Sequence, residues 1–186
     1  ATAALRNGQI QECHAFIDSA KCLLENAKTL EHADFWNIVG RLRTYHLDFK
    51  GATEAFATAS ELSTDNDRHL IPWAESVLRN NQQNADGHVE NLSPVIERIK
   101  SNSPIAIGMR ARLIASTGNF DLATKTTESL SGTQRFTSRA LIFSMQGKWK
   151  ETLAECESGL KESVLDQPSK LIYLMLRARS RYSIAI

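Results

Sequence analysis

The stretch FWNIVGRLRTYHLDFKGATEAFATA, residues 35–59, reads as two amphipathic helices joined by a short turn. Gly-Asn-Phe at 118–120 and Gly-Lys-Trp at 147–149 also lie between amphipathic stretches, and each has an aromatic residue two positions after a glycine. This recurrence predicts a chain built by repetition, because a single hairpin cannot bury its apolar face alone. We therefore expect helical hairpins stacked in a row.

The composition is that of an ordinary folded protein. Of the 186 residues, 42% are hydrophobic and 23% are charged, which excludes wholesale disorder. The formal net charge is +1, so no global field attracts nucleic acid or a membrane surface. No apolar run is long enough to span a bilayer. We expect no nucleic-acid partner and no membrane insertion.

Glycines, prolines and capping residues predict where the helices begin and end. Neighbouring helices should be antiparallel, because the connections are short, and no strand pattern is present. The sequence predicts an all-α protein with a polar loop at 80–87 and helices at about 9–26, 34–47, 52–62, 72–79, 94–100, 104–117, 120–130, 133–146, 149–163 and from 166 to the end.

Trp36, Gly40, Ala52, Phe56 and Ala59 resemble the spaced Trp, Gly, Ala and Phe positions of the tetratricopeptide repeat. Weaker matches recur along most of the chain, with Cys156 in place of Phe, Gly159 in place of Ala, and Ala178 at the small position of the last helix. They are poor between residues 68 and 100.

The resemblance implies an α-α superhelix of antiparallel hairpins, a single degenerate array over residues 1–186. Because the array starts and ends with half a hairpin, we expect a segment of a longer solenoid or multidomain protein. The alternatives are another α-α repeat or an irregular helical domain.

Motifs of enzyme and metal sites are missing from the sequence. No histidine pair has the spacing that places two metal ligands on one helix face, and no nucleophile elbow or phosphate-binding loop occurs. We expect no catalytic residues, no cofactor and no metal. The three cysteines, Cys13, Cys22 and Cys156, form no Cys-x-x-Cys motif, so we expect reduced thiols and a cytoplasmic protein.

Three arginines, Arg41, Arg112 and Arg179, share one offset in the expected first helices of their hairpins, and the resemblance places that offset in a concave groove. Asn37 and Tyr45 lie one turn on either side of Arg41. Guanidinium groups bind carboxylates in a bidentate manner, so we expect these five residues to bind a protein or peptide with acidic groups. The plainer interpretation is that the arginines are solvated or paired on the surface.

The predicted function is a non-enzymatic scaffold that binds a partner peptide or protein on its concave face. The alternative is a regulatory or substrate-docking segment of a larger multidomain protein, such as a transcription regulator or a transferase. The third class, a helical enzyme, would need converging acid, base or metal groups, and the sequence offers none.

Overall fold

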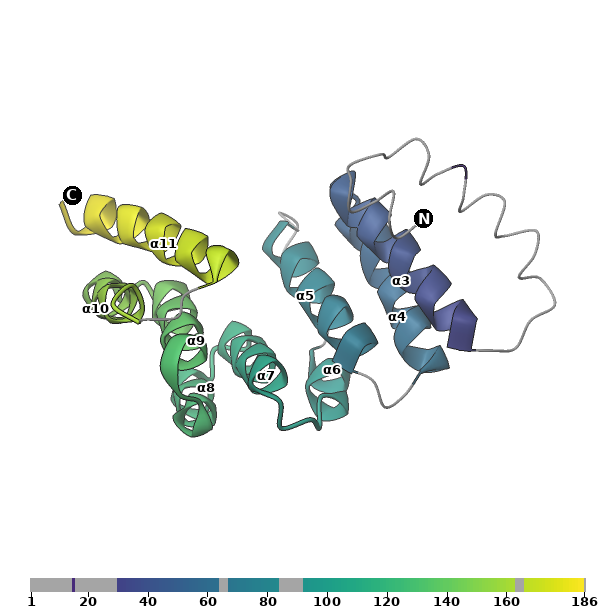
Figure 1. Cartoon of the computed structure of the whole chain (residues 1–186), viewed down its shortest axis with the longest axis horizontal. Coiled ribbons are helices and arrows are strands. Elements are labelled where there is room, and N and C mark those ends of the chain that lie inside the picture. Colours follow the sequence, from purple (N-terminus) through teal and green to yellow (C-terminus); the bar gives the residue numbers. More distant parts are fainter. Residues whose placement is uncertain (1–14, 16–29, 64–66, 84–91, 163–165, 186) are drawn as a thin grey trace. The chain divides into compact units, whose positions relative to one another are not determined.

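A computed structural model describes residue 15 and residues 30–63, 67–83, 92–162 and 166–185. The elements within these ranges are all helices, which confirms the all-α prediction (Figure 1). The helix expected at 9–26 lies outside the described residues, except for Ala15, which is helical. The chain divides into two compact units, Ala1–Arg98 and Ile99–Ile186.

The first unit contains four described helices. They are α3 (Leu30–Tyr45), α4 (Phe49–Leu62), α5 (Asp67–Gln83) and α6 (Ser93–Arg98). Helix α4 packs against both α3 and α5, and α3 also contacts α5, so these three helices lie side by side (Figure 1). Helix α6 packs against α5.

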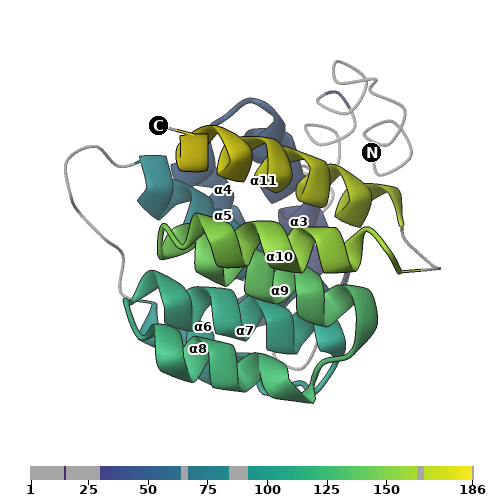
Figure 2. The ribbon, with the colours of Figure 1, turned by 90° about the vertical axis from the view of Figure 1, so that its left-hand side faces the viewer.

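The second unit follows the same packing pattern. Its elements are α7 (Pro104–Ser116), α8 (Phe120–Thr126), the 3-10 turn η1 (Thr127–Ser129), α9 (Gly132–Met145), α10 (Trp149–Gly159) and α11 (Gln167–Ala185). Helix α7 contacts α8 and α9. Helix α10 packs between α9 and α11, which also touch each other (Figure 2).

Several predicted helix ends were wrong. Helix α5 begins before Pro72 and continues to Gln83, so the first part of the expected loop at 80–87 is helical. Helix α8 ends at Thr126, and the 3-10 turn η1 leads from it to Leu130, which is extended and buried. Helix α10 ends at Gly159 and does not reach residue 163.

The predicted start of α7 is confirmed. Ser103 is the N-cap and accepts a hydrogen bond from the Ala106 amide at 3.2 Å, and Pro104 is the first helical residue. Gly118 follows the helix in the left-handed region, with φ +84°. These are the roles that serine, proline and glycine fill at helix ends, so the sequence predicts both ends of α7.

One turn geometry joins three helix pairs. Gly118, between α7 and α8, and Gly147, between α9 and α10, have φ of +84° and +71°. Leu47 holds the same place between α3 and α4 with φ +62°. The residues after these three have nearly equal backbone angles, φ −85° to −80° and ψ 70° to 75°. The sequence predicted the two glycine turns. It also predicted a short turn between α3 and α4, but without a glycine the left-handed conformation of Leu47 was not predicted.

The hairpin of α3 and α4 closes around a contact between Gly40 and Phe56. A Cβ atom at Gly40 would lie only 2.7–2.8 Å from the Phe56 ring, so a larger residue does not fit there without movement. Ala52 and Ala59 on α4 are fully buried, and Trp36 packs against the cluster that contains Ala55. Gly40, Ala52, Phe56 and Ala59 are therefore all buried in the hairpin, and Trp36 packs partly buried beside them.

Leu47→Gly should stabilise the protein. A non-glycine residue in the left-handed region costs about 1–2 kcal/mol, and Leu47 is 71% exposed, so little burial is lost. The added freedom of glycine in the unfolded chain offsets about 0.5–1 kcal/mol of this gain. We expect the free energy of unfolding, measured with urea, to rise by about 0.5–1 kcal/mol. Gly118→Ala, at the equivalent place with no neighbouring atom within 4 Å, should lower it.

Ala52→Leu should destabilise the first unit. Ala52 has 0% exposure, so the longer side chain overpacks the hairpin and costs about 1–3 kcal/mol. Lys50→Leu is the control, because Lys50 lies on the exposed face of the same helix. An unchanged urea midpoint for Ala52→Leu would show that the hairpin core is packed differently.

Candidate ligand-binding site

A cavity of about 220 Å³ opens in the first unit and combines charged groups with an apolar lining. It lies where α3 and α5 approach each other beside α4. Its lining residues come from all three helices: Arg41, Thr44, Phe56, Pro72, Glu75, Ser76 and Arg79.

Pro72 shapes one side of this cavity from inside α5. A proline has no amide hydrogen, so the carbonyl four residues earlier, that of Arg68, loses its usual helical donor. The side-chain amide of Asn37 on α3 donates to this carbonyl with an N–O distance of 3.4 Å. The proline in α5 is therefore accommodated by a side chain from a neighbouring helix.

Asn37 is the centre of a chain of polar contacts beneath the cavity. Its Oδ1 accepts a hydrogen bond of 2.9 Å from Nε of Arg41, and its Nδ2 lies 3.3 Å from Nδ1 of His69. Asn37 is only 5% exposed. The Asn37 amide thus holds the Arg41 side chain in place. It is too buried to contact a ligand directly.

His69 is the buried end of this chain, with 3% exposure. Because Asn37 donates to Nδ1, the neutral ring carries its proton on Nε2, which lies 3.7 Å from Oδ1 of Asp34. Burial lowers the pKa of His69 below 6.5, and the charges of Arg68 and Arg41 act in the same direction. Asp34 opposes the shift but does not cancel it, so the folded protein favours a neutral His69.

The charges around the cavity differ in how far they are paired. Arg79 forms an ion pair with Glu75 at 3.0 Å on the same helix. Arg41 is fixed through Nε by the neutral amide of Asn37, which does not balance its charge. Phe56 and Pro72 add apolar surface. A cavity with this lining suits a carboxylate that carries a small apolar group.

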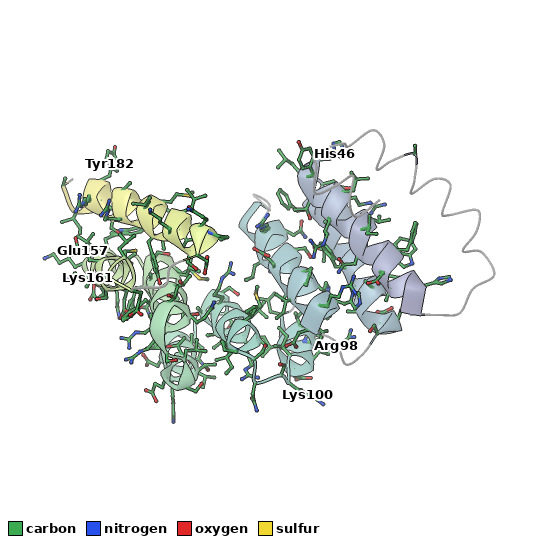
Figure 3. The ribbon with its side chains drawn as sticks, in the orientation of Figure 1. His46, Arg98, Lys100, Glu157, Lys161 and Tyr182 are labelled. Carbon is green, nitrogen blue, oxygen red and sulfur yellow. The ribbon has the colours of Figure 1, made fainter. Side chains whose placement is uncertain are left out.

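The structure brings together some of the predicted site residues. Arg41 lines the cavity and Asn37 positions it, whereas Tyr45 is 62% exposed and does not line the cavity. The ring of Tyr45 packs edge-on against His46, which Figure 3 shows at the end of α3.

Arg112 and Arg179 belong to the second unit. Arg112 is half-buried on α7 and already engaged in an interaction, and Arg179 stacks 5.0 Å from the Trp149 ring centroid. Whether they form one row with Arg41 stays a prediction.

The α5 side of the cavity, with Pro72, Glu75 and Arg79, was not predicted from the sequence. Glu75 and Arg79 have the spacing of four that pairs charges on a helix, which was the one available signal. That this pair would lie opposite Arg41 follows only from the packing of α5 beside α3.

Burial raises the pKa of Cys156 to about 11, so this thiol stays protonated at neutral pH. Cys13 and Cys22 lie outside the described residues. Within the described ranges, no group of three or more His, Cys, Asp or Glu side chains is arranged to hold a metal ion.

No family model, curated protein or solved structure matches this chain. None of the helices that the structure describes combines the length and the apolar character needed to cross a bilayer.

The buried, neutral His69 should make stability depend on pH. Its pKa is lower in the folded protein than in the unfolded chain, so the unfolded state binds the proton first as pH falls. The stabilisation is complete above pH 6.5 and is lost progressively as pH falls from there through the folded-state pKa. We expect urea unfolding to show a steeper loss of stability between pH 7.5 and 5 in the wild type than in His69→Gln.

His46→Gln is the matched control for this pH dependence, because His46 is exposed. It should keep the wild-type pH profile. If His69→Gln and the wild type lose stability in parallel, the titration of His69 does not contribute.

Proposed function

We propose that this chain is a non-enzymatic scaffold that binds an acidic peptide segment of a partner protein. The cavity of α3, α4 and α5 supports this function, and Arg41 is the observation that carries it. Arg41 is exposed, and Asn37 holds it through a single hydrogen bond at 2.9 Å. A fixed guanidinium beside an apolar wall loses less conformational entropy on binding than a free surface arginine does.

The ligand we propose carries a carboxylate, from an acidic side chain or from a C-terminus, next to a small apolar group. The carboxylate would bind the terminal nitrogens of Arg41, and the apolar group would contact Phe56 and Pro72. Glu75 restricts the site, because it repels a second negative charge near Arg79. The proposed specificity is therefore for a single carboxylate and not for a densely charged segment.

We also propose that the hairpins form a tetratricopeptide-like array. Three hairpins share one turn geometry, as described above. The first helix of each hairpin has a buried small residue at the same distance before the turn. The second helix of each hairpin has a buried residue at the same distance after the turn. These residues are Gly40, Ala111 and Ala140 in the first helices, and Ala52, Ala123 and Thr152 in the second helices.

Contacts between successive first helices also support this arrangement. Helix α3 contacts α5 within the first unit, and α7 contacts α9, which in turn contacts α11, within the second. Stacked hairpins place their first helices side by side in this way, and such a row forms a binding surface. The proposed cytoplasmic location rests on the reduced, buried Cys156 alone.

Arg41→Ala should weaken peptide binding without unfolding the protein. The probe is a phage-displayed library of random peptides with free C-termini, selected on the wild-type chain and then measured by fluorescence anisotropy. Loss of a hydrogen bond to a charged group costs about 1.5–3 kcal/mol, so we expect selected peptides to bind Arg41→Ala about tenfold to a hundredfold more weakly. Binding should also weaken with added salt.

Arg135→Ala is the matched control, because Arg135 is an exposed arginine of α9 in the other unit. Arg41→Lys should bind with intermediate affinity, since lysine keeps the charge but loses the planar fork. If the library yields no carboxylate-bearing peptides, or if these peptides bind Arg41→Ala as tightly as the wild type, the proposed function is wrong.

A further inference from the structure

Helix α11 has two opposite faces that differ in what covers them. One face carries Tyr173 and Ser180, both with 0% exposure. The Tyr173 hydroxyl donates to the Thr133 carbonyl at 2.9 Å, which anchors this face on α9. The opposite face is apolar and exposed, and we call it the open face of α11: Leu171 (59%), Leu174 (38%), Met175 (64%), Tyr182 (71%) and, between them, the exposed Ala178.

In the hairpins α3–α4 and α9–α10, the second helix covers the corresponding face of the first helix. Gly40 of α3 lies against the Phe56 ring of α4, and Ala140 of α9 is buried in a cluster with Cys156 of α10. The offset that aligns Arg41 with Arg179 aligns Gly40 with Ala178, which each precede these arginines by one residue. Ala178 is exposed, so the face that a second helix buries in α3 and α9 lacks such a cover in the described residues.

Figure 3 shows this division on α11. The labelled Tyr182 points away from the side of the helix on which α10 and Glu157 lie. Glu157 of α10 pairs with Arg181 at 3.5 Å, so the covered side of α11 already has its charge partner. The Tyr182 side is the one that can accept another element.

The charges on α11 indicate which kind of element would cover its open face. Helix α11 carries four basic residues and no acidic residue between Gln167 and Ala185. At 100° per residue, the basic residues flank the open face on both of its sides. These flanking residues are Lys170, Arg177, Arg179 and Arg181. Two of them also contact α10, since Arg181 pairs with Glu157 and Arg179 stacks on Trp149.

The covered hairpins show what such flanking arginines pair with. Arg43, three residues after Gly40, lies 4.0 Å from Asp48 and 3.8 Å from Glu54 around the start of α4. Arg139, one residue before Ala140, pairs with Glu155 of α10 at 2.9 Å.

Helix α11 has arginines at both of these places, Arg181 and Arg177, relative to Ala178. Arg181 already pairs with Glu157 of α10, so Arg177 is the one for which a cover would supply the acidic partner. In the two covered hairpins, an arginine of the first helix thus pairs with acidic residues in or next to the second helix.

We propose that the open face of α11 binds an amphipathic helix of a partner protein, with an apolar stripe over Ala178 and acidic residues at its edges. A second copy of this chain fits less well, because two antiparallel α11 helices would bring their basic edges together. This site is separate from the cavity at Arg41 and does not depend on the peptide function proposed above.

The probe for this site is a peptide with the sequence of residues 48–63, which span Asp48 and all of α4. Helix α4 covers the corresponding face of α3, and the peptide carries a net negative charge. A hydrocarbon staple in place of the half-buried Ala57 and the exposed Glu61, four residues apart on α4, holds the isolated peptide helical and leaves the carboxylates of Asp48 and Glu54 free. Fluorescence anisotropy should show saturable binding to the full chain that weakens with salt.

Met175→Glu and Tyr182→Glu should each weaken peptide binding at least tenfold, because they place a carboxylate on the open face against an acidic helix. Both residues are more than 60% exposed, so the fold should tolerate the changes. Leu122→Glu, at a 47% exposed leucine of α8, changes the net charge by the same amount and is the control, which should bind like the wild type. Phe56→Asp in the peptide should abolish binding, whereas Arg41→Ala in the chain should not affect it.

Three results would overturn the proposal. The first is the absence of saturable peptide binding, or binding that neither open-face variant weakens. The second is sedimentation of the wild type as a dimer that Met175→Glu dissociates, which would assign the face to a second copy. The third is binding to vesicles of phosphatidylserine and phosphatidylcholine without binding to the peptide, which would assign the face to a membrane surface.

Discussion

The first helical hairpin depends on one close approach, that of the Phe56 ring to the backbone of α3 at Gly40. Glycine is required there because the ring occupies the space that any side chain would fill. The contact places α4 between α3 and α5, which also touch, and so brings Arg41 to the same side as Pro72 and Glu75. The cavity at Arg41 thus depends on this contact, because the Phe56 ring also lines the cavity and Gly40 is the neighbour of Arg41 in the chain.

The second unit uses the same constraint with different residues. At Gly159 the neighbouring side chain is Tyr173, which takes the space that a Cβ atom would need. Thr137 and the Thr133 carbonyl satisfy the buried Tyr173 hydroxyl, so the ring costs no unpaired polar group. A glycine on one helix and an aromatic ring on the next therefore set the spacing in both units, and α11 owes its position to this contact.

Polar side chains form hydrogen bonds with groups that lack a partner within their own helix. Pro72 costs α5 one hydrogen bond, and Asn37 of α3 supplies the missing donor to Arg68 while it holds Arg41. His69 completes the arrangement as a neutral acceptor. The proposed binding residue, the proline and the histidine are therefore linked through a single amide. A substitution at any of these three residues is expected to alter the geometry of the cavity.

The sequence by itself determined the helical class, the capped start of α7 and the glycine turns at Gly118 and Gly147, because local chemistry decides these features. Ser-Pro starts a helix, and glycine alone adopts the left-handed conformation without strain. It also singled out Arg41, through its place in the hairpin pattern.

Only the tertiary structure decided that Leu47 occupies the same turn conformation, that Asn37 is buried beneath Arg41, and that Glu75 and Arg79 face it. It also revealed that Ala178 lies on an exposed apolar face that no other described element covers. These features depend on which helices meet across the fold, and no local pattern of residues encodes that.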